Sequence, residues 1–179
     1  MVTKHNFYII TGGPGSGKTS VIDTLQQRGY SCIPEVGRSV IKKQLEEGGD
    51  ALPWKNVKAY ADLMLDYSIN DFIRLADSDK IYFFDRGIPD TYGYEKLIRM
   101  DISPELENAV SGYRYNNKVF ILPPWEEIYT TDGERKQDFQ EAVATYEMMF
   151  STYSGLGYEL IIVPKTNIDS RVDFILENL

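Results

Sequence analysis

A glycine-rich segment, GGPGSGKT, carries the residues whose types and spacing are best suited to chemistry. It runs from Gly12 to Thr19 and matches the pattern G-x-x-x-x-G-K-[ST] at every restricted position. Glycines let a chain curl tightly and let backbone N–H groups approach an anion closely. In such a loop Lys18 neutralises charge on β- and γ-phosphates, and the Thr19 hydroxyl ligates Mg²⁺. We therefore assign the contacts to a nucleotide to Gly12, Gly13, Pro14, Gly15, Ser16, Gly17, Lys18 and Thr19.

The surroundings of this segment favour a phosphate-binding loop over a glycine-rich turn that matches by chance. An apolar run, Phe7–Thr11, precedes it and is typical of a buried strand. A stretch compatible with a helix, Lys18–Arg28, follows it and ends at Gly29, a residue favoured just past a helix C-terminus. The positive end of that helix would attract a phosphate. We expect the bound nucleotide to be MgATP.

A carboxylate ends a second apolar run, IYFFDRG, at Asp85. Phosphate-binding loops of this type work with an acid at the tip of a neighbouring strand, which holds magnesium. We therefore predict Thr19 and Asp85 as the metal contacts, and Lys18 and Asp85 as catalytic groups. The alternative is an ordinary acidic residue at a strand end.

The residue after Asp85 separates subclasses of such proteins. Motor-type ATPases usually carry a glutamate there that activates water, but this chain has Arg86. Residues 90–93 (DTYG) spell the D-x-x-G of signalling GTPases, yet they lie five residues beyond the strand end, and residues 117–120 (NKVF) lack the guanine motif N-K-x-D. An Asp-Arg pair at this point is instead typical of small-molecule and nucleotide kinases, where the arginine faces the acceptor's phosphate or the transferred group.

Apolar runs that are typical of buried strands alternate with longer helical stretches along the whole chain. This alternation predicts a parallel sheet wrapped by helices, in a three-layer α/β/α fold that forms a single domain over residues 1–179. The expected strands are Phe7–Thr11, Tyr30–Pro34, Lys80–Asp85, Lys118–Leu122 and Tyr158–Val163. The expected helices are Lys18–Arg28, Pro53–Ala76, one that starts at Ser103-Pro104, Gln137–Tyr153 and Asp169–Leu179.

The composition excludes several classes of function. The chain of 179 residues carries 19 Lys and Arg against 27 Asp and Glu, a net charge of -8 that disfavours nucleic acid as a partner. Its single histidine, His5, and single cysteine, Cys32, allow neither a catalytic triad nor a zinc site nor an internal disulfide. The apolar runs are too short for a membrane span or a signal peptide, so we expect a cytoplasmic protein.

Together these features resemble the P-loop kinase-like ATPase domain family typified by the C-terminal, ribosylnicotinamide-kinase part of NadR. The resemblance spans nearly the whole chain. Besides the loop it rests on the segments Pro34–Arg38, Asp85–Gly87 with Asp90 beyond, Asp132–Arg135, and the run from Val163 through Arg171 to Leu179. It implies a five-stranded parallel sheet, nucleotide binding at the carboxyl edge of that sheet, and a mobile lid.

The lid implied by the resemblance corresponds to residues 123–138. Two prolines end the preceding strand, and the segment then becomes polar, with a turn signal at Asp132-Gly133. Arg135, followed by Lys136, would close over the phosphates and stabilise charge that develops during transfer. The alternative is a solvated helix start whose charges are incidental.

The segment after the second expected strand faces the acceptor in this family. Glu35 would orient or deprotonate an acceptor hydroxyl, and Arg38 would hold an acceptor phosphate, although the two residues are equally able to form a surface salt bridge. Arg86 and Asp90 complete the predicted acceptor contacts. After the last strand, Lys165 is a candidate contact for the base, and nothing in the sequence selects adenine over guanine. Aromatic residues that are able to wall the acceptor pocket, although core packing is the commoner role, are Tyr60, Tyr67, Tyr92 and Tyr94.

The sequence thus predicts a phosphotransferase that moves the γ-phosphate of MgATP to a small nucleoside, nucleotide or related metabolite. The alternative is a nucleotide-dependent regulatory or binding protein that hydrolyses ATP or GTP slowly. The partner in the first case is a small-molecule phosphate acceptor. The sequence identifies neither that acceptor nor the oligomeric state.

Overall fold

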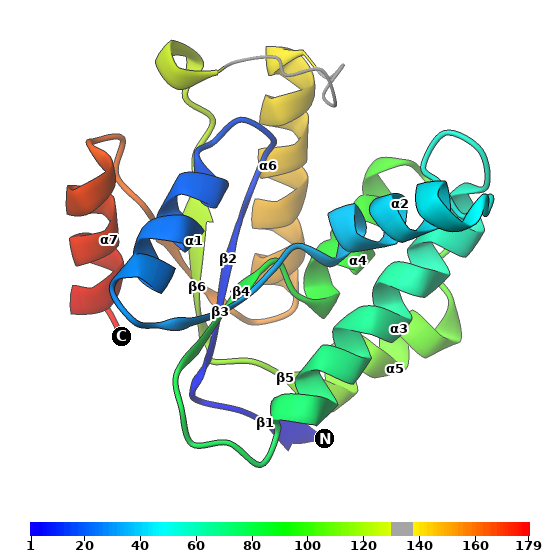
Figure 1. Cartoon of the computed structure of the whole chain (residues 1–179), viewed down its shortest axis with the longest axis horizontal. Coiled ribbons are helices and arrows are strands. Elements are labelled where there is room, and N and C mark those ends of the chain that lie inside the picture. Colours follow the sequence, from blue (N-terminus) through cyan, green and yellow to red (C-terminus); the bar gives the residue numbers. More distant parts are fainter. Residues whose placement is uncertain (130–137) are drawn as a thin grey trace.

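Five parallel strands form the central sheet of the molecule, in the order β3-β4-β2-β6-β7 (Figure 1). The structure, a computed structural model, describes residues 1–129 and 138–179. The strands are β2 (Phe7–Gly12), β3 (Ser31–Ile33), β4 (Tyr82–Asp85), β6 (Lys118–Leu122) and β7 (Glu159–Ile162). The five predicted strands and their parallel arrangement are confirmed. Three of them, β3, β4 and β7, are each two residues shorter than predicted. A separate pair of two-residue strands, β1 (Val2–Thr3) and β5 (Tyr113–Arg114), is also parallel.

Helices cover both faces of this sheet and make the predicted three layers. On one face lie α1 (Lys18–Gln27) and α7 (Ile168–Glu177), which Figure 1 shows side by side. The opposite face is covered by α3 (Val57–Leu75), α4 (Ile88–Leu97), α5 (Pro104–Gly112) and α6 (Phe139–Gly155). Neighbouring residues of the central strand serve opposite faces, because side chains alternate along a strand: Ile9 packs toward the α3–α6 side, and Ile10 packs against α1 and α7.

Two helices were not among the predicted elements. Helix α2 (Val36–Glu47) follows β3, packs against α3 and ends at Gly48, whose φ of 69° lies in the left-handed region. Helix α4 begins directly after Arg86 and Gly87, so the strand β4 passes into it through a two-residue connection. The predicted helix from residue 53 begins later, at Val57, because Asn56 caps it by accepting a hydrogen bond from the Ala59 backbone N–H.

This topology brings the predicted chemistry to one edge of the sheet. Parallel strands all end at the same edge, and ligands of open α/β sheets bind outside the carboxyl ends of the strands. The central strand β2 runs into the glycine loop there, and β4 ends beside it, with Ile10 paired to Asp85. Among the helices of the described ranges, none is both long and apolar enough to span a membrane.

Candidate functional site

The glycine loop between β2 and α1 has the backbone shape that its sequence predicts. Gly17, the residue before α1, has a φ of 86° that a residue with a side chain would adopt only under strain. A Cβ on Gly13 would lie 2.3 Å from the backbone oxygen of Ala142 in α6, so only glycine allows this close approach. The loop is also closed on itself, because the Ser16 hydroxyl donates to the Gly13 oxygen over 2.9 Å.

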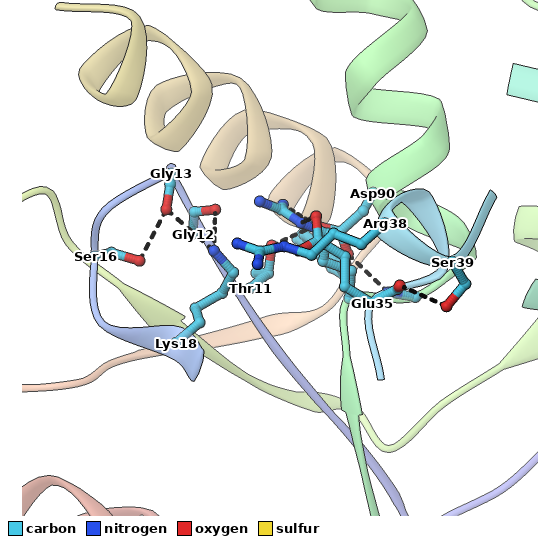
Figure 2. Close-up of polar contacts among 12 residues, drawn as sticks. Thr11, Gly12, Gly13, Ser16, Lys18, Glu35, Arg38, Ser39 and Asp90 are labelled. Atoms are coloured by element: carbon cyan, nitrogen blue, oxygen red, sulfur yellow. Dashed lines mark hydrogen bonds and ion pairs between the residues drawn. The ribbon is translucent and has the colours of Figure 1, made fainter. Parts of the chain in front are cut away.

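Lys18 lies inside the loop with its side chain only 6% exposed. Figure 2 shows its ammonium directed at the carbonyl oxygens of Gly12 and Gly13, to which Nζ donates over 3.4 and 3.1 Å. Burial lowers the pKa of Lys18 to about 8; Arg86 acts in the same direction, and neighbouring carboxylates offset part of the effect. Two carbonyl oxygens thus hold a buried cation where a phosphate group would be a stronger partner.

Asp85 ends β4 beside the loop, and its carboxylate is incompletely satisfied. The side chain is 8% exposed, and Oδ1 is buried without a hydrogen-bond partner among the described residues. Burial raises the pKa of Asp85 to about 6, and Lys18 limits that rise. A buried, unpartnered carboxylate oxygen beside a phosphate-binding loop fits a magnesium ligand, since Mg²⁺ prefers oxygen ligands and usually keeps several waters. The Thr19 side chain, exposed at the start of α1, supplies the other predicted ligand.

Arg86 connects the strand end to the segment after β3. Its φ of 72° lies in the left-handed region, which is uncommon for a residue other than glycine. Its guanidinium donates from Nε to Glu35 Oε1 and from Nη1 to Asp90 Oδ1, each over 3.1 Å. Burial disfavours the charge on Arg86, but the carboxylates of Glu35 and Asp90 outweigh this effect and raise its pKa. The arginine is therefore fixed by two acids of the protein itself.

Asp90 is the most fully satisfied acid of the site. Besides Arg86, its carboxylate accepts hydrogen bonds from the Thr11 hydroxyl and the Tyr153 hydroxyl, each over 2.5 Å, and from the Gly87 backbone N–H over 2.9 Å. The side chain is 5% exposed. With its oxygens already occupied by protein donors, Asp90 is placed to orient Arg86. Its predicted contact with the acceptor stays a prediction.

Glu35 and Arg38 form the pair that the sequence allowed, and the acid has a second partner. Arg38 Nε donates to Glu35 Oε2 over 3.2 Å, and the arginine side chain is 46% exposed. Burial favours a neutral Glu35, but the charges of Arg86 and Lys18 outweigh it and hold the pKa of Glu35 below its ordinary value. Glu35 is thus ionised at neutral pH and shared between two arginines (Figure 2).

Two cavities meet at Lys18 and Glu35, which line both. The first, about 410 Å³, runs along the loop and the start of α1 to a wall formed by Trp125, Ile128, Thr166, Asn167, Ile168 and Arg171. The second, about 610 Å³, extends from Asp85 and Arg86 between α2, α3, α4 and α6. The structure therefore brings Lys18, Asp85, Arg86, Glu35, Arg38 and Asp90 to one place, around the junction of the two cavities.

Some of the predicted site residues lie elsewhere. Lys165 is exposed and does not line the first cavity, although its neighbours Thr166 and Asn167 do. Of the aromatic candidates, Tyr60 and Tyr94 line the second cavity and contact each other edge to face at 5.9 Å, whereas Tyr67 and Tyr92 do not line it. Arg135, Lys136 and half of the predicted lid, residues 130–137, fall outside the described residues. Within the segment 123–129, Glu126–Ile128 form a short 3-10 helix.

Sequence reasoning missed residues that matter to the geometry of the site. Thr11 and Tyr153 hold Asp90, but they are 79 and 63 residues from it in the chain. Trp125 and Arg171, which lie 46 residues apart in the chain, both form part of the wall of the first cavity. Arg171 falls within the segment that carries the family resemblance, but it is not among the predicted site residues. No local pattern points to any of these residues, because each acts through a contact made only in the fold.

Comparisons with known proteins agree with this geometry. The chain is similar to a deoxyadenosine kinase from M. mycoides with a TM-score of 0.67 at 13% identity, covering 96% of this chain and 97% of that one. It is similar to a NadR protein whose structure holds NR, with a TM-score of 0.71 at 14% identity, covering 96% of this chain and 49% of that one. At such identities the likeness shows a shared fold.

The sequence also has a curated relative in Aquifex aeolicus (strain VF5), a "Probable DNA double-strand break repair Rad50 ATPase". The two are 29% identical over 146 residues, which is 75% of this chain but only 14% of that protein. The AAA domain family matches residues 7–171, from the first residue of β2 to the fourth residue of α7. That match covers most of the chain, so the protein belongs to the AAA domain family, and the predicted P-loop kinase-like ATPase domain is confirmed.

Proposed function

We propose that this protein is a phosphotransferase that moves the γ-phosphate of MgATP to a hydroxyl of a small acceptor. The observation that carries the proposal is the pair of cavities that meet at Lys18 and Glu35. One contains the phosphate-binding loop and suits a nucleotide donor. The other begins beside the same lysine and suits a second molecule, so donor and acceptor would meet next to the catalytic lysine.

The size of the second cavity favours transfer to a molecule over transfer to water. Sites for small organic ligands measure roughly 300–1,000 Å³, and the second cavity measures about 610 Å³. Hydrolysis needs room for a single water and a group that activates it. Arg86 follows Asp85 where a water-activating glutamate would stand in motor-type ATPases, and its guanidinium is already bound by two carboxylates.

The charges around this cavity favour an acceptor without a phosphate of its own. Arg86 is paired with Glu35 and Asp90, and Arg38 shares Glu35 with it. An acceptor phosphate would have to displace these carboxylates or lie beside them. The cavity also presents the edge-to-face rings of Tyr60 and Tyr94, which suit a planar base. The likeness in fold to a deoxyadenosine kinase over the full length of both chains adds support for a nucleoside-like acceptor.

In the proposed reaction the acceptor oxygen attacks the γ-phosphorus and the bond from that phosphorus to the β–γ bridging oxygen breaks. The acceptor proton passes to a carboxylate, either Asp85 or Glu35, and ADP leaves. Lys18 would exchange its two carbonyl partners for the β- and γ-phosphate oxygens and stabilise the charge that moves onto ADP. Arg86 and Glu35 would orient the acceptor, and catalysis would rest on positioning and electrostatics.

Magnesium, held by Thr19 and Asp85, would neutralise phosphate charge when bound with ATP. Arg135 stays a predicted contributor, since it lies outside the described residues. Within those residues, no cluster of three or more acidic, histidine or cysteine side chains offers a metal site. A site with few protein ligands is what a metal shared with substrate phosphates requires.

The test is the release of ADP from MgATP with and without an acceptor. A panel of nucleosides, each matched with its 5′-monophosphate, should contain at least one nucleoside that accelerates ADP release and appears as a phosphorylated product. Its monophosphate should be the poorer acceptor. If ADP forms at one rate whatever is added, the alternative applies, a nucleotide-dependent regulatory protein with slow hydrolysis, and the transferase proposal is wrong.

A further inference from the structure

Arg171, in the second turn of α7, is a buried cation that forms no ion pair with an acid of the described residues. Its side chain is 2% exposed, and Nε is buried without a hydrogen-bond partner in the described part of the chain. Burial lowers the pKa of Arg171. By contrast, Arg28, which also joins α1 to α7, forms ion pairs with Asp169 and Asp173. A buried charge without an ionic partner is costly and marks a residue kept for binding.

The position of this guanidinium links the phosphate loop to the rest of the first cavity. Arg171 Nη2 donates to the backbone oxygen of Ser16 over 3.0 Å. Its Nη1 would lie 2.7 Å from a Cβ on Gly17, so the glycine at this position makes room for the arginine. Arg171 therefore lies directly against the loop that is expected to hold the phosphates, and it forms part of the cavity wall.

Trp125 lies beside the same guanidinium. The Arg171 Cζ lies 5.7 Å from the centre of the indole ring, within the range of a cation–π contact. Both side chains line the first cavity, together with the apolar Ile128 and Ile168. Besides the arginine, this end of the cavity has the polar residues Thr166 and Asn167. The other end, beside Lys18, is where the β- and γ-phosphates of a donor would lie.

We infer that Arg171 and Trp125 form a clamp for the base of the donor nucleotide, which inserts between the guanidinium and the indole. The inference rests on the proposed function, because it assumes that the loop holds the donor phosphates. A planar guanidinium stacks on aromatic faces as an ammonium does not.

The clamp must open slightly to accept a base. Atoms in contact are separated by about 3.5–4.0 Å, so a base between two planes needs about 7–8 Å between them. The present separation of 5.7 Å is too small, and Trp125 must therefore move when a nucleotide enters. A ligand that carries phosphates but no base leaves the indole where it is.

Isothermal titration of two ligands tests the clamp: MgATP, and magnesium tripolyphosphate, which has the phosphates alone. Arg171→Met should weaken MgATP at least about tenfold, because loss of one stacking partner of a base costs about this much, and should change tripolyphosphate affinity less than about threefold. Arg28→Met is the matched control, since it removes another arginine between α1 and α7 outside the cavity. It should leave both affinities unchanged. Arg171→Lys should bind MgATP as weakly as Arg171→Met.

The outcomes separate the clamp from other roles of the residue. Equal losses for both ligands mean that Arg171 only supports the shape of the loop, and the inference is wrong. Full affinity in Arg171→Lys means that charge alone suffices, and the stacking is wrong. If wild-type protein binds tripolyphosphate but no nucleotide, the clamp fails while the phosphate site stands; if it binds neither, the proposed function fails as well.

Tryptophan fluorescence gives an independent readout, because the chain has two tryptophans. The other one, Trp54, lines the second cavity, and a Trp54→Phe background leaves Trp125 as the only tryptophan. MgATP should change the Trp125 emission and tripolyphosphate should not. The same emission change with both ligands, or with neither, contradicts insertion of a base beside the indole.

Discussion

Replacing Asp85 with asparagine should make the protein more stable and less active at the same time. The carboxylate is 8% exposed, and its Oδ1 has no partner among the described residues, so the fold bears an unfavourable buried charge. Asparagine has nearly the same shape but no charge. Active-site residues often destabilise the fold, because their charges are placed to bind a ligand and not to stabilise the protein alone.

The pKa of Asp85 gives the magnitude. Burial raises it from 3.8 to about 6. Because each tenfold change in a proton equilibrium is worth about 1.4 kcal/mol, the ionised acid destabilises the fold at neutral pH by at most about 3 kcal/mol. Removing the charge should raise the free energy of unfolding by roughly 1–3 kcal/mol, and the melting temperature by about 2–4 °C for each kcal/mol in a chain of this size.

The effect should depend on pH in one direction. Below pH 3.8 the acid is protonated in both folded and unfolded chains, so the charge costs nothing. Between 3.8 and about 6 the unfolded chain has lost the proton and the folded chain retains it, and the cost grows with pH until both are ionised. The stability difference between Asp85→Asn and wild type should therefore increase from about pH 4 to about pH 6 and stay constant above.

Urea unfolding from pH 4 to pH 8 measures this difference, and turnover of MgATP with a confirmed acceptor is measured alongside. Turnover should fall about 100-fold or more, as for other preorganised charges in active sites. Asp66→Asn is the matched control, because Asp66 is exposed on α3 and its replacement changes the net charge equally. A variant that is less stable than wild type at pH 7, or whose difference does not change with pH, would refute the reasoning.

Three further predictions follow from the site. Lys18→Met should lower MgATP affinity at least about 100-fold in calorimetry without lowering the melting temperature, since methionine removes a buried charge. The MgATP affinity of the wild-type protein should fall above about pH 8, because Lys18 loses its proton there, and an affinity that does not change with pH would contradict that pKa. Arg135→Ala should reduce kcat and kcat/KM about tenfold with KM unchanged, as for a contact made only in the transition state; equal kcat rules out this role. Tyr153→Phe should lower the free energy of unfolding by about 1–3 kcal/mol in urea, because Asp90 loses a buried hydrogen-bond donor. It should also raise the KM for the acceptor, because Arg86 is then held less firmly by Asp90; an unchanged KM would mean that Asp90 has no part in acceptor binding.

The part of the site that the sequence predicts is the part that is local in the chain. The loop, its lysine and the helix that follows occupy one continuous segment, and glycine and lysine spacing encodes their geometry directly. Asp85 is predictable for a similar reason, because an apolar run that ends in an acid places that acid at a strand tip. The positions of Glu35 and Arg38 after β3 were also expected, and the structure adds that Glu35 bridges two arginines.

The helices that the sequence did not predict lack a clear apolar stripe. In α2 the buried residues are Gly37 and Val40, too few to mark a period. Helix α4 contacts α3, α5 and α6, so its buried residues include Asp90, Thr91 and Glu95, and the usual contrast between an apolar and a polar face is missing. The network around Asp90 was unpredictable for the same reason, since its partners come from strands and helices far apart in the sequence.

The carboxylates of the site also imply how strongly donor binding depends on magnesium. Asp85 and Glu35 lie near Lys18, and Glu35 stays ionised because of the arginines around it. The phosphates of free ATP would be repelled by these two carboxylates, and Lys18 would offset only part of that repulsion. A divalent cation between Asp85 and the phosphates would attract both of them instead. Wild-type protein should therefore bind MgATP far more tightly than ATP in EDTA. In Asp85→Asn the repulsion from this acid and its contact with the metal both disappear, while Glu35 stays ionised, so the two affinities should move closer together. If the ratio of the two dissociation constants is the same in both proteins, Asp85 does not hold the metal, and its buried charge needs another explanation.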